Sequence, residues 1–452
     1  MSKATSYRHH TRALALLALP LVGSHLAQLA ITLTDAAMLG WYSVEALAGE
    51  ILGGTLFYVV FIVGSGFAFA IMPLVAAAAE IDDQTQVRRI TRMGAWASIL
   101  FGLAVIPPMV WSESLFLALG QDARIAALAQ DYLAILAWAV MPSLLVMVLK
   151  SYLAALERTQ VILWVTVAAL VLNIFVNYVL VFGNFGFPEM GIRGAALASL
   201  IVNVASFVVL AIYIARVLPE HSLFQRLWRP DWEALGQVSR LGWPIGLTNL
   251  AEVSLFAAST TMMGWLGKIP LAAHGIALQA ASVAFMIHLG LSNAATVRIS
   301  QAYSRADRIS MRTIAKSAMA ITALVAVTAS TLFIVFPEAI LGVFMHPNEP
   351  DRAAVITVGV VLLAAAALFQ MIDGLQVLAL GFLRGIQDTK VPMVIAVFSY
   401  WIIGVSASYY LGFVIGMEGL GVWLGLAIGL AVAAVLLLAR YWQITTSSEQ
   451  DT

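Results

Sequence analysis

The sequence carries little charge. Of its 452 residues, 11% are charged and 62% are hydrophobic, whereas soluble domains average about 25% charged and about 45–50% apolar residues. A water-soluble fold of this length needs more charge to solvate its surface. The composition therefore excludes an ordinary soluble domain and predicts a protein whose solvent is lipid.

Cysteine is also absent. This excludes disulfides, thiolate metal sites and cysteine nucleophiles, but it gives no information about the redox compartment. Basic and acidic residues balance at 24 each, for a net charge of zero. Charge alone therefore gives no reason to expect nucleic acid binding.

Long apolar runs replace the missing charge. A helix needs about 20 apolar residues to cross the hydrocarbon, and the first run, which reaches about Gly40, is too long for a secretory signal. We predict an all-α integral membrane protein with twelve transmembrane helices, near residues 14–40, 50–77, 93–111, 127–153, 161–183, 194–216, 237–264, 271–300, 314–336, 354–383, 391–413 and 417–440.

Twelve spans place both ends of the chain on one side of the membrane. The basic residues fall on that same side, except for Arg124, Arg193, Lys268 and Arg352. Because lysine and arginine concentrate in cytoplasmic loops, this side is predicted to be cytoplasmic. We expect a multi-pass protein of the bacterial inner membrane.

The two halves of the chain resemble each other. At one constant offset, Pro20 corresponds to Pro244, Gly66 to Gly290, and the run from Asp83 to that from Asp307. Six spans in each half give the halves the same orientation, as in parallel-repeat transporters. We predict an N-terminal six-helix lobe at 1–217, a cytoplasmic linker at 218–236 and a C-terminal six-helix lobe at 237–452, with the two lobes around a central cleft.

Three carboxylates lie inside predicted spans: Asp35, Glu252 and Asp373. Each costs at least about 2.5–3.5 kcal/mol to insert, and such residues are usually functional. At 1.5 Å per residue, Glu252 and Asp373 both lie roughly 17 Å from the cytoplasmic boundary. No lysine or arginine is expected at a comparable depth, so a proton or a metal cation must supply the positive charge.

Polar residues continue each acid along its helix face. These stripes predict that the acids face a cavity or a neighbouring helix rather than lipid. Polar groups that only join helices are the alternative for the amides. The candidates are Gln28 and Thr32 with Asp35, then Asn173 and Asn177, then Asn249, Phe256 and Ser259 with Glu252, and Gln279, Gln370 and Gln376 with Asp373.

The acid-bearing segments resemble a known family. The run Leu33-Thr34-Asp35-Ala36-Ala37-Met38-Leu39-Gly40, the run Glu252-Val253-Ser254-Leu255-Phe256 and the run Gln370-Met371-Ile372-Asp373-Gly374-Leu375-Gln376 are similar to the multidrug and toxic compound extrusion (MATE) family, in its NorM-type bacterial branch. The resemblance covers essentially the whole chain.

The resemblance implies antiport of drug-like, often cationic compounds against Na⁺ or H⁺. It places Glu252 and Asp373 in a cation site of the C-terminal lobe, where we expect Na⁺. It places Asp35, Asn173 and Asn177 in the polar site of the N-terminal lobe, with Ser199 as a weaker match.

We therefore expect a secondary active exporter that is not an enzyme. No catalytic residues, nucleotide motif or cofactor are expected beyond the coupling ion, and the partners are small organic cations and the bilayer, with the chain acting as a monomer. The closest alternative is a lipid-linked oligosaccharide flippase, which should carry lysine or arginine in its cavity. An integral-membrane enzyme and a channel are less favoured alternatives.

Overall fold

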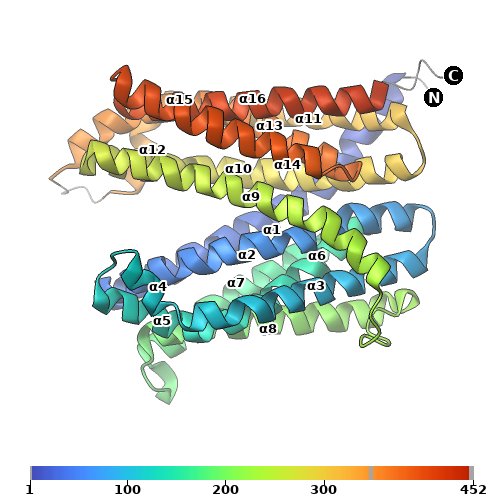
Figure 1. Ribbon diagram of the computed structural model, residues 1–452, viewed down its shortest axis with the longest axis horizontal. Helices are drawn as coiled ribbons and strands as arrows, with labels where there is room; N and C mark the ends of the chain where they lie inside the picture. Colours follow the sequence, from blue (N-terminus) through green and yellow to red (C-terminus); the bar gives the residue numbers. More distant parts are fainter. Residues whose placement is uncertain (1–2, 346–349, 447–452) are drawn as a thin grey trace. The chain divides into compact units, whose positions relative to one another are not determined.

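The computed structural model describes the backbone of residues 3–345 and 350–446. This part of the chain is helical and contains no strand (Figure 1). The helices are α1 (Lys3–Tyr42), α2 (Val44–Glu80), α3 (Gln84–Val110), α4 (Glu113–Ala118), α5 (Ala123–Leu136), α6 (Val140–Ala155), α7 (Thr159–Phe182), α8 (Gly191–Val217), α9 (Trp232–Leu266), α10 (Lys268–Ser304), α11 (Arg308–Val335), α12 (Pro337–Val343), α13 (Arg352–Gly385), α14 (Lys390–Val397), α15 (Ser406–Tyr409) and α16 (Glu418–Thr446).

The predicted spans all correspond to helical segments. Within the described residues, eleven segments are long and apolar enough to cross a membrane. Helix α9, which carries Glu252, corresponds to the remaining predicted span near 237–264. Two spans are not continuous α-helices. A 3₁₀ turn at Ala137–Ala139 joins α5 to α6, and π-helical turns at Phe398–Val405 and Tyr410–Val414 flank α15.

The chain forms two compact units. One unit is Gly23–Leu247, and the other combines Met1–Val22 with Thr248–Thr452. The units differ from the lobes predicted at 1–217 and 237–452, because the first half of α1 packs in the C-terminal unit and the first half of α9 packs in the N-terminal unit. Both divisions of the chain fall within helices rather than in the 218–236 segment.

Repeat-related glycines make these two exchanged contacts. A Cβ added to Gly66 on α2 would lie 2.5 Å from the backbone nitrogen of Gly246 on α9, within the N-terminal unit. A Cβ added to Gly290 on α10 would lie 2.8 Å from the backbone nitrogen of Val22 on α1, within the C-terminal unit. Gly66 and Gly290 correspond in the repeat, as do Val22 and Gly246, so the repeat is present in the packing as well as in the sequence.

The segment between α8 and α9 is fixed to the N-terminal unit. Arg89 on α3 donates through Nε to Asp231 at 2.5 Å and pairs with Glu233 at 2.7 Å. Arg92 donates to the backbone carbonyl of Leu223 at 2.8 Å. Hydrogen bonding from Arg89 holds the pKa of the Asp231 carboxyl below its usual value. The predicted linker is therefore part of the N-terminal unit.

The two described ends of the chain contact the same helix of the C-terminal unit. Thr11 near the start of α1 donates to Ser317 on α11 at 3.0 Å. Tyr441 near the end of α16 donates to the carbonyl of Met311 on α11 at 3.0 Å. Both ends therefore lie at one end of this unit's helices (Figure 1).

Candidate functional site

The N-terminal unit builds a closed polar site around Asp35. This residue lies on α1 and is 8% exposed. Its Oδ1 accepts hydrogen bonds from Nδ2 of Asn173 at 2.9 Å and of Asn177 at 2.6 Å, both on α7. Ser199 on α8 lies 3.5 Å from Oδ2. The i,i+4 spacing of the two asparagines aims both amides at one carboxylate oxygen, and the structure also brings in the serine that was the weaker match.

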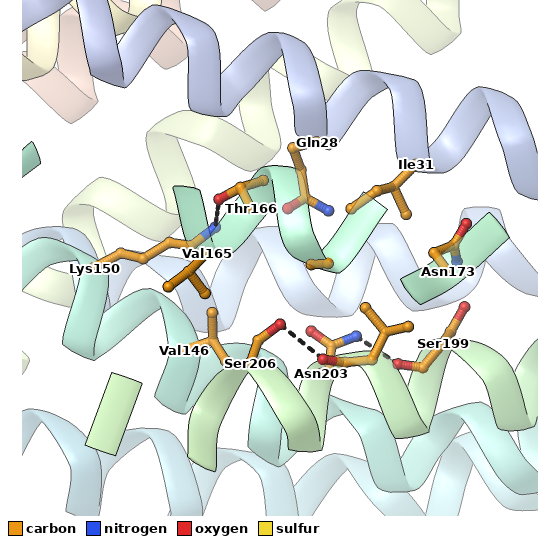
Figure 2. A pocket seen from close by; sticks show the side chains of 12 residues that line it. Gln28, Ile31, Val146, Lys150, Val165, Thr166, Asn173, Ser199, Asn203 and Ser206 are labelled. Carbon is orange, nitrogen blue, oxygen red and sulfur yellow. Dashed lines mark hydrogen bonds between the residues drawn. The ribbon is translucent and has the colours of Figure 1, made fainter. Parts of the chain in front are cut away.

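A cavity of ≈ 40 Å³ adjoins this site. Figure 2 shows Gln28 of α1, Asn173 of α7 and Ser199 of α8 among the residues around it. Gln28 therefore belongs to the polar site as predicted from its stripe. Thr32 does not line the cavity. It is exposed, and its hydroxyl lies 3.5 Å from the backbone carbonyl of Gln28.

Glu50 on α2 is a second acid beside Asp35 that the sequence reasoning missed. The two carboxyl charges interact, and Tyr132 on α5 lies within the influence of both. Glu50 stands at the edge of the predicted second span, so its depth could not be read from sequence. An acid within a transmembrane helix can nevertheless be seen in the sequence, so Glu50 could have been singled out on that ground.

The C-terminal unit brings Glu252 and Asp373 together. They lie on α9 and α13, are 9% and 1% exposed, and are close enough for their charges to interact. Both oxygens of Asp373 and Oε1 of Glu252 are buried without a hydrogen-bond partner among the described residues. Buried carboxylates without donors need a cation or a proton, so these atoms fit a coupling ion.

Other polar groups of this unit surround the two acids. Gln376 on α13 donates to the hydroxyl of Tyr400. The charges of both acids act on this hydroxyl. Tyr400 is fully buried in a π-helical turn and was not singled out from the sequence. An aromatic residue usually indicates a core position, and no simple sequence pattern predicts a π-helical turn. Such turns occur frequently at functional sites.

Arg384 corrects one expectation. It lies at the end of α13 and is 9% exposed, its Nη2 donates to Oδ1 of Asn249 at 2.9 Å, and its charge acts on Glu252. In the N-terminal unit, Lys150 of α6 lines the polar cavity. The acids therefore have basic neighbours that the expectation about depth left out, because these long side chains reach inward from positions near helix ends.

The remaining predicted residues take packing or backbone-bonding positions. Gln370 donates to the carbonyl of Ala281 at 3.0 Å, and Ser259 donates to that of Phe256 at 2.7 Å. The Phe256 ring packs edge-on to Phe369, with centroids 5.9 Å apart. Gln279 is half-buried on α10. Of the polar residues predicted around Glu252 and Asp373, Gln376 and Asn249 are the two with a described hydrogen bond to a group that interacts with the acids.

Comparison with known proteins identifies the family. The MatE family profile matches residues 20–179 and 244–410. The chain is 46% identical to the "Probable multidrug resistance protein NorM" of Rhizobium meliloti (strain 1021), over 97% of this chain and 94% of the relative. It is 43% identical to the protein of the same description from Agrobacterium fabrum (strain C58), over 97% and 95%.

Solved structures share the fold. A MATE protein in a straight conformation aligns with a TM-score of 0.88 at 18% identity, over 98% of this chain and 97% of that one. A eukaryotic MATE transporter aligns with a TM-score of 0.86 at 20% identity, over 99% of each chain. The family is one of transporters, which confirms the prediction that the chain is not an enzyme. With a twelve-helix fold, a matching profile over most of its length and relatives above 40% identity, this chain is a multi-pass membrane protein that belongs to the MatE family.

Proposed function

We propose that this protein is a secondary active multidrug efflux transporter that exchanges organic, often cationic compounds for Na⁺ or H⁺. The descriptions of its bacterial relatives support the class of substrate. The observation that carries the coupling proposal is the pair Glu252 and Asp373, because Oε1 of Glu252 and both oxygens of Asp373 are buried without a hydrogen-bond partner among the described residues. A site that concentrates negative charge in this way is stabilised by a bound cation.

Coupling follows from differential affinity. A cation that binds the acids in one conformation favours that conformation, and a drug that binds the other favours the reverse. The two compact units, which divide within α1 and α9, supply the two bodies that alternating access needs. We place the protein in the bacterial inner membrane with both termini cytoplasmic, because the basic residues and both chain ends gather on one side.

The C-terminal site is proposed to take Na⁺. Sodium prefers oxygen ligands, and Glu252 and Asp373 offer carboxylates with the Gln376 amide and the Tyr400 hydroxyl nearby. Bridging by one metal ion removes the repulsion of two neighbouring carboxylates in a low dielectric. Protonation of one acid is the competing solution. Arg384 already acts on Glu252, so a single monovalent cation is enough to balance the site.

Transport into proteoliposomes tests this proposal. An inward Na⁺ gradient should drive export of a fluorescent organic cation while ionophores clamp the pH gradient and the voltage. Glu252→Gln or Asp373→Asn should each remove that drive, because each removes one carboxylate with little change in volume. Transport that follows only the pH gradient would show that the sodium assignment is wrong. Transport under neither gradient would contradict secondary active transport itself.

A further inference from the structure

Lys150 is an inward-facing cation without a counter-ion in its own helix bundle. Its ammonium donates to Oγ1 of Thr166 on α7 at 2.8 Å (Figure 2). Within residues 3–345 and 350–446, no acidic side chain forms an ion pair with it. Placing a charged amine inside a transmembrane bundle is costly and usually marks function. The accessible part of its side chain faces the ≈ 40 Å³ cavity.

The same cavity leads to Asp35, which is an acid without a cation. Asn173 and Ser199 line the cavity, and both contact the Asp35 carboxylate. Thr166, the partner of Lys150, lines it as well. The cavity therefore adjoins both Lys150 and the residues that hold the Asp35 carboxylate.

The spacing of the lining residues along α7 and α8 indicates how far the cavity extends. Thr166 and Asn173 are seven residues apart on α7, and Ser199 and Ser206 are seven residues apart on α8, so each pair spans two turns, about 10 Å. Both pairs line the cavity, and Asn203 lies between the two serines (Figure 2). Hydroxyl and amide groups thus follow the path from Asp35 to Lys150.

The volume suits water rather than a drug. Binding sites for drug-sized molecules occupy about 300–1,000 Å³, whereas one water needs roughly 10–15 Å³ of space for its centre together with 2–4 polar partners. A cavity of ≈ 40 Å³ with this lining accommodates a few waters. Waters between an acid and an amine form a hydrogen-bonded connection for protons.

We propose that Lys150 is a second proton-carrying residue of the N-terminal unit, which exchanges a proton with Asp35 through water in this cavity. The O–H bond of the Asp35 carboxylic acid breaks, the proton passes along the water hydrogen bonds, and an N–H bond forms on the neutral Lys150 amine. The products are a carboxylate and an ammonium, so the unit's net charge does not change. This step rests on the proposed antiport and specifies how protons would pass through the N-terminal unit.

Few other titratable groups face this path. His25 on α1 interacts with Lys150. Glu50 on α2 and Tyr132 on α5 interact with Asp35. The residues that α7 and α8 contribute to the cavity are amides, hydroxyls and aliphatic side chains. Lys150 is therefore the amine that this cavity offers to a proton from Asp35.

The test compares Lys150→Arg and Lys150→Met with the unmodified protein, each as the full chain in liposomes with ethidium as the organic cation. A guanidinium keeps the charge but does not release its proton, and methionine keeps the length without an ionisable group. Both variants should lose transport driven by a pH gradient by about a hundredfold or more, the lower end of the effect of a positioned proton carrier. Lys390→Met, which removes an exposed lysine, is the matched control and should transport normally.

A second assay separates proton exchange from structure. Exchange of labelled for unlabelled ethidium at equal pH needs no net proton movement, so Lys150→Arg should retain it. Parallel loss of exchange and net transport in both variants would show a structural role and overturn the proposal. Normal driven transport in either variant, or driven transport in the unmodified protein that ignores the pH gradient, would also overturn it.

Two further outcomes have definite meanings. Chloride dependence that disappears in Lys150→Met would show that the cavity holds a small anion, which contradicts proton exchange. If the unmodified protein transports, Asp35→Asn does not, and both Lys150 variants do, only this inference fails. Absence of transport by the unmodified protein under any gradient would instead contradict the proposed function.

Discussion

At the scale of single residues, the central position of the N-terminal unit's polar site is Asp35. Three side chains from two other helices contact its carboxylate, and Asn177 does so at 2.6 Å. Asp35→Asn keeps an oxygen that can accept from the asparagines and removes only the charge. We expect drug resistance in a pump-deficient host to fall to that of the empty host, with the level of protein in the membrane unchanged.

The control for this variant is the conservative change Asp35→Glu, which restores the carboxylate but lengthens the side chain by one methylene. It should recover part of the resistance, because the charge is present while the hydrogen bonds to Asn173 and Asn177 are displaced. Full resistance with Asp35→Asn would show that Asp35 serves packing rather than transport.

The sequence allowed some of these residues to be predicted, and the reason is periodicity. Acids deep within spans and polar groups at i+3 or i+4 share a face, so Asp35, Asn173, Asn177 and Asp373 could be assigned. Lys150, Glu50 and Arg384 lie near helix ends, where the helical period does not show whether a long side chain points outward to water or inward. Tyr400 is aromatic and lies in a π-turn, so its polar role depends on a tertiary contact with Gln376.

At the scale of elements, glycines decide how closely helices approach. Gly421, Gly425 and Gly429 follow each other at intervals of four residues on α16, so they share one face of the helix. A Cβ at Gly425 would lie 2.1 Å from the backbone nitrogen of Ser408 on α15, and one at Gly429 would lie 2.7 Å from Cα of Gly404. This face of α16 therefore packs against the span with π-helical turns.

Gly425→Ala should therefore destabilise the C-terminal unit. The added methyl overlaps backbone atoms that cannot rotate away, and overpacking of this kind costs about 1–3 kcal/mol. Thermal unfolding of the purified protein should show a lower midpoint. Gly275→Ala on α10 is the control, because a Cβ there meets no atom within 4 Å, and alanine favours a helix over glycine by up to about 1 kcal/mol. An equal effect of the two substitutions would contradict the close approach.

The attachment of the segment between α8 and α9 is also a matter of contacts between elements. Proline, tryptophan and charge made residues 218–236 look like a linker between lobes. The helix bounds place 218–231 between α8 and α9, and 232–236 at the start of α9. Sequence could not show that Arg89 and Arg92 attach this segment to α3, since the partners are more than a hundred residues apart in the chain.

At the scale of the whole molecule, the division of α1 and α9 between units is the least expected feature. The repeat was visible in the sequence as matched Pro, Gly and Asp residues. Asp83 and Asp307 indeed cap α3 and α11 in the same way, each accepting from the backbone three residues on. The exchange of helix halves was not visible, because periodicity within a helix does not report which neighbour each turn packs against.

A disulfide tests which unit the start of α1 moves with. Thr11 and Ser317 lie 3.0 Å apart, oxygen to oxygen, and the chain has no native cysteine, so Thr11→Cys with Ser317→Cys gives one defined pair. It should form readily under oxidation, as measured by a mobility shift and by loss of thiol labelling. If residues 1–22 belong to the C-terminal unit, the linked protein should transport as fast as its reduced form. If they instead belong to an N-terminal lobe at 1–217, the link would join two bodies that rock against each other, and transport should stop until a reductant is added.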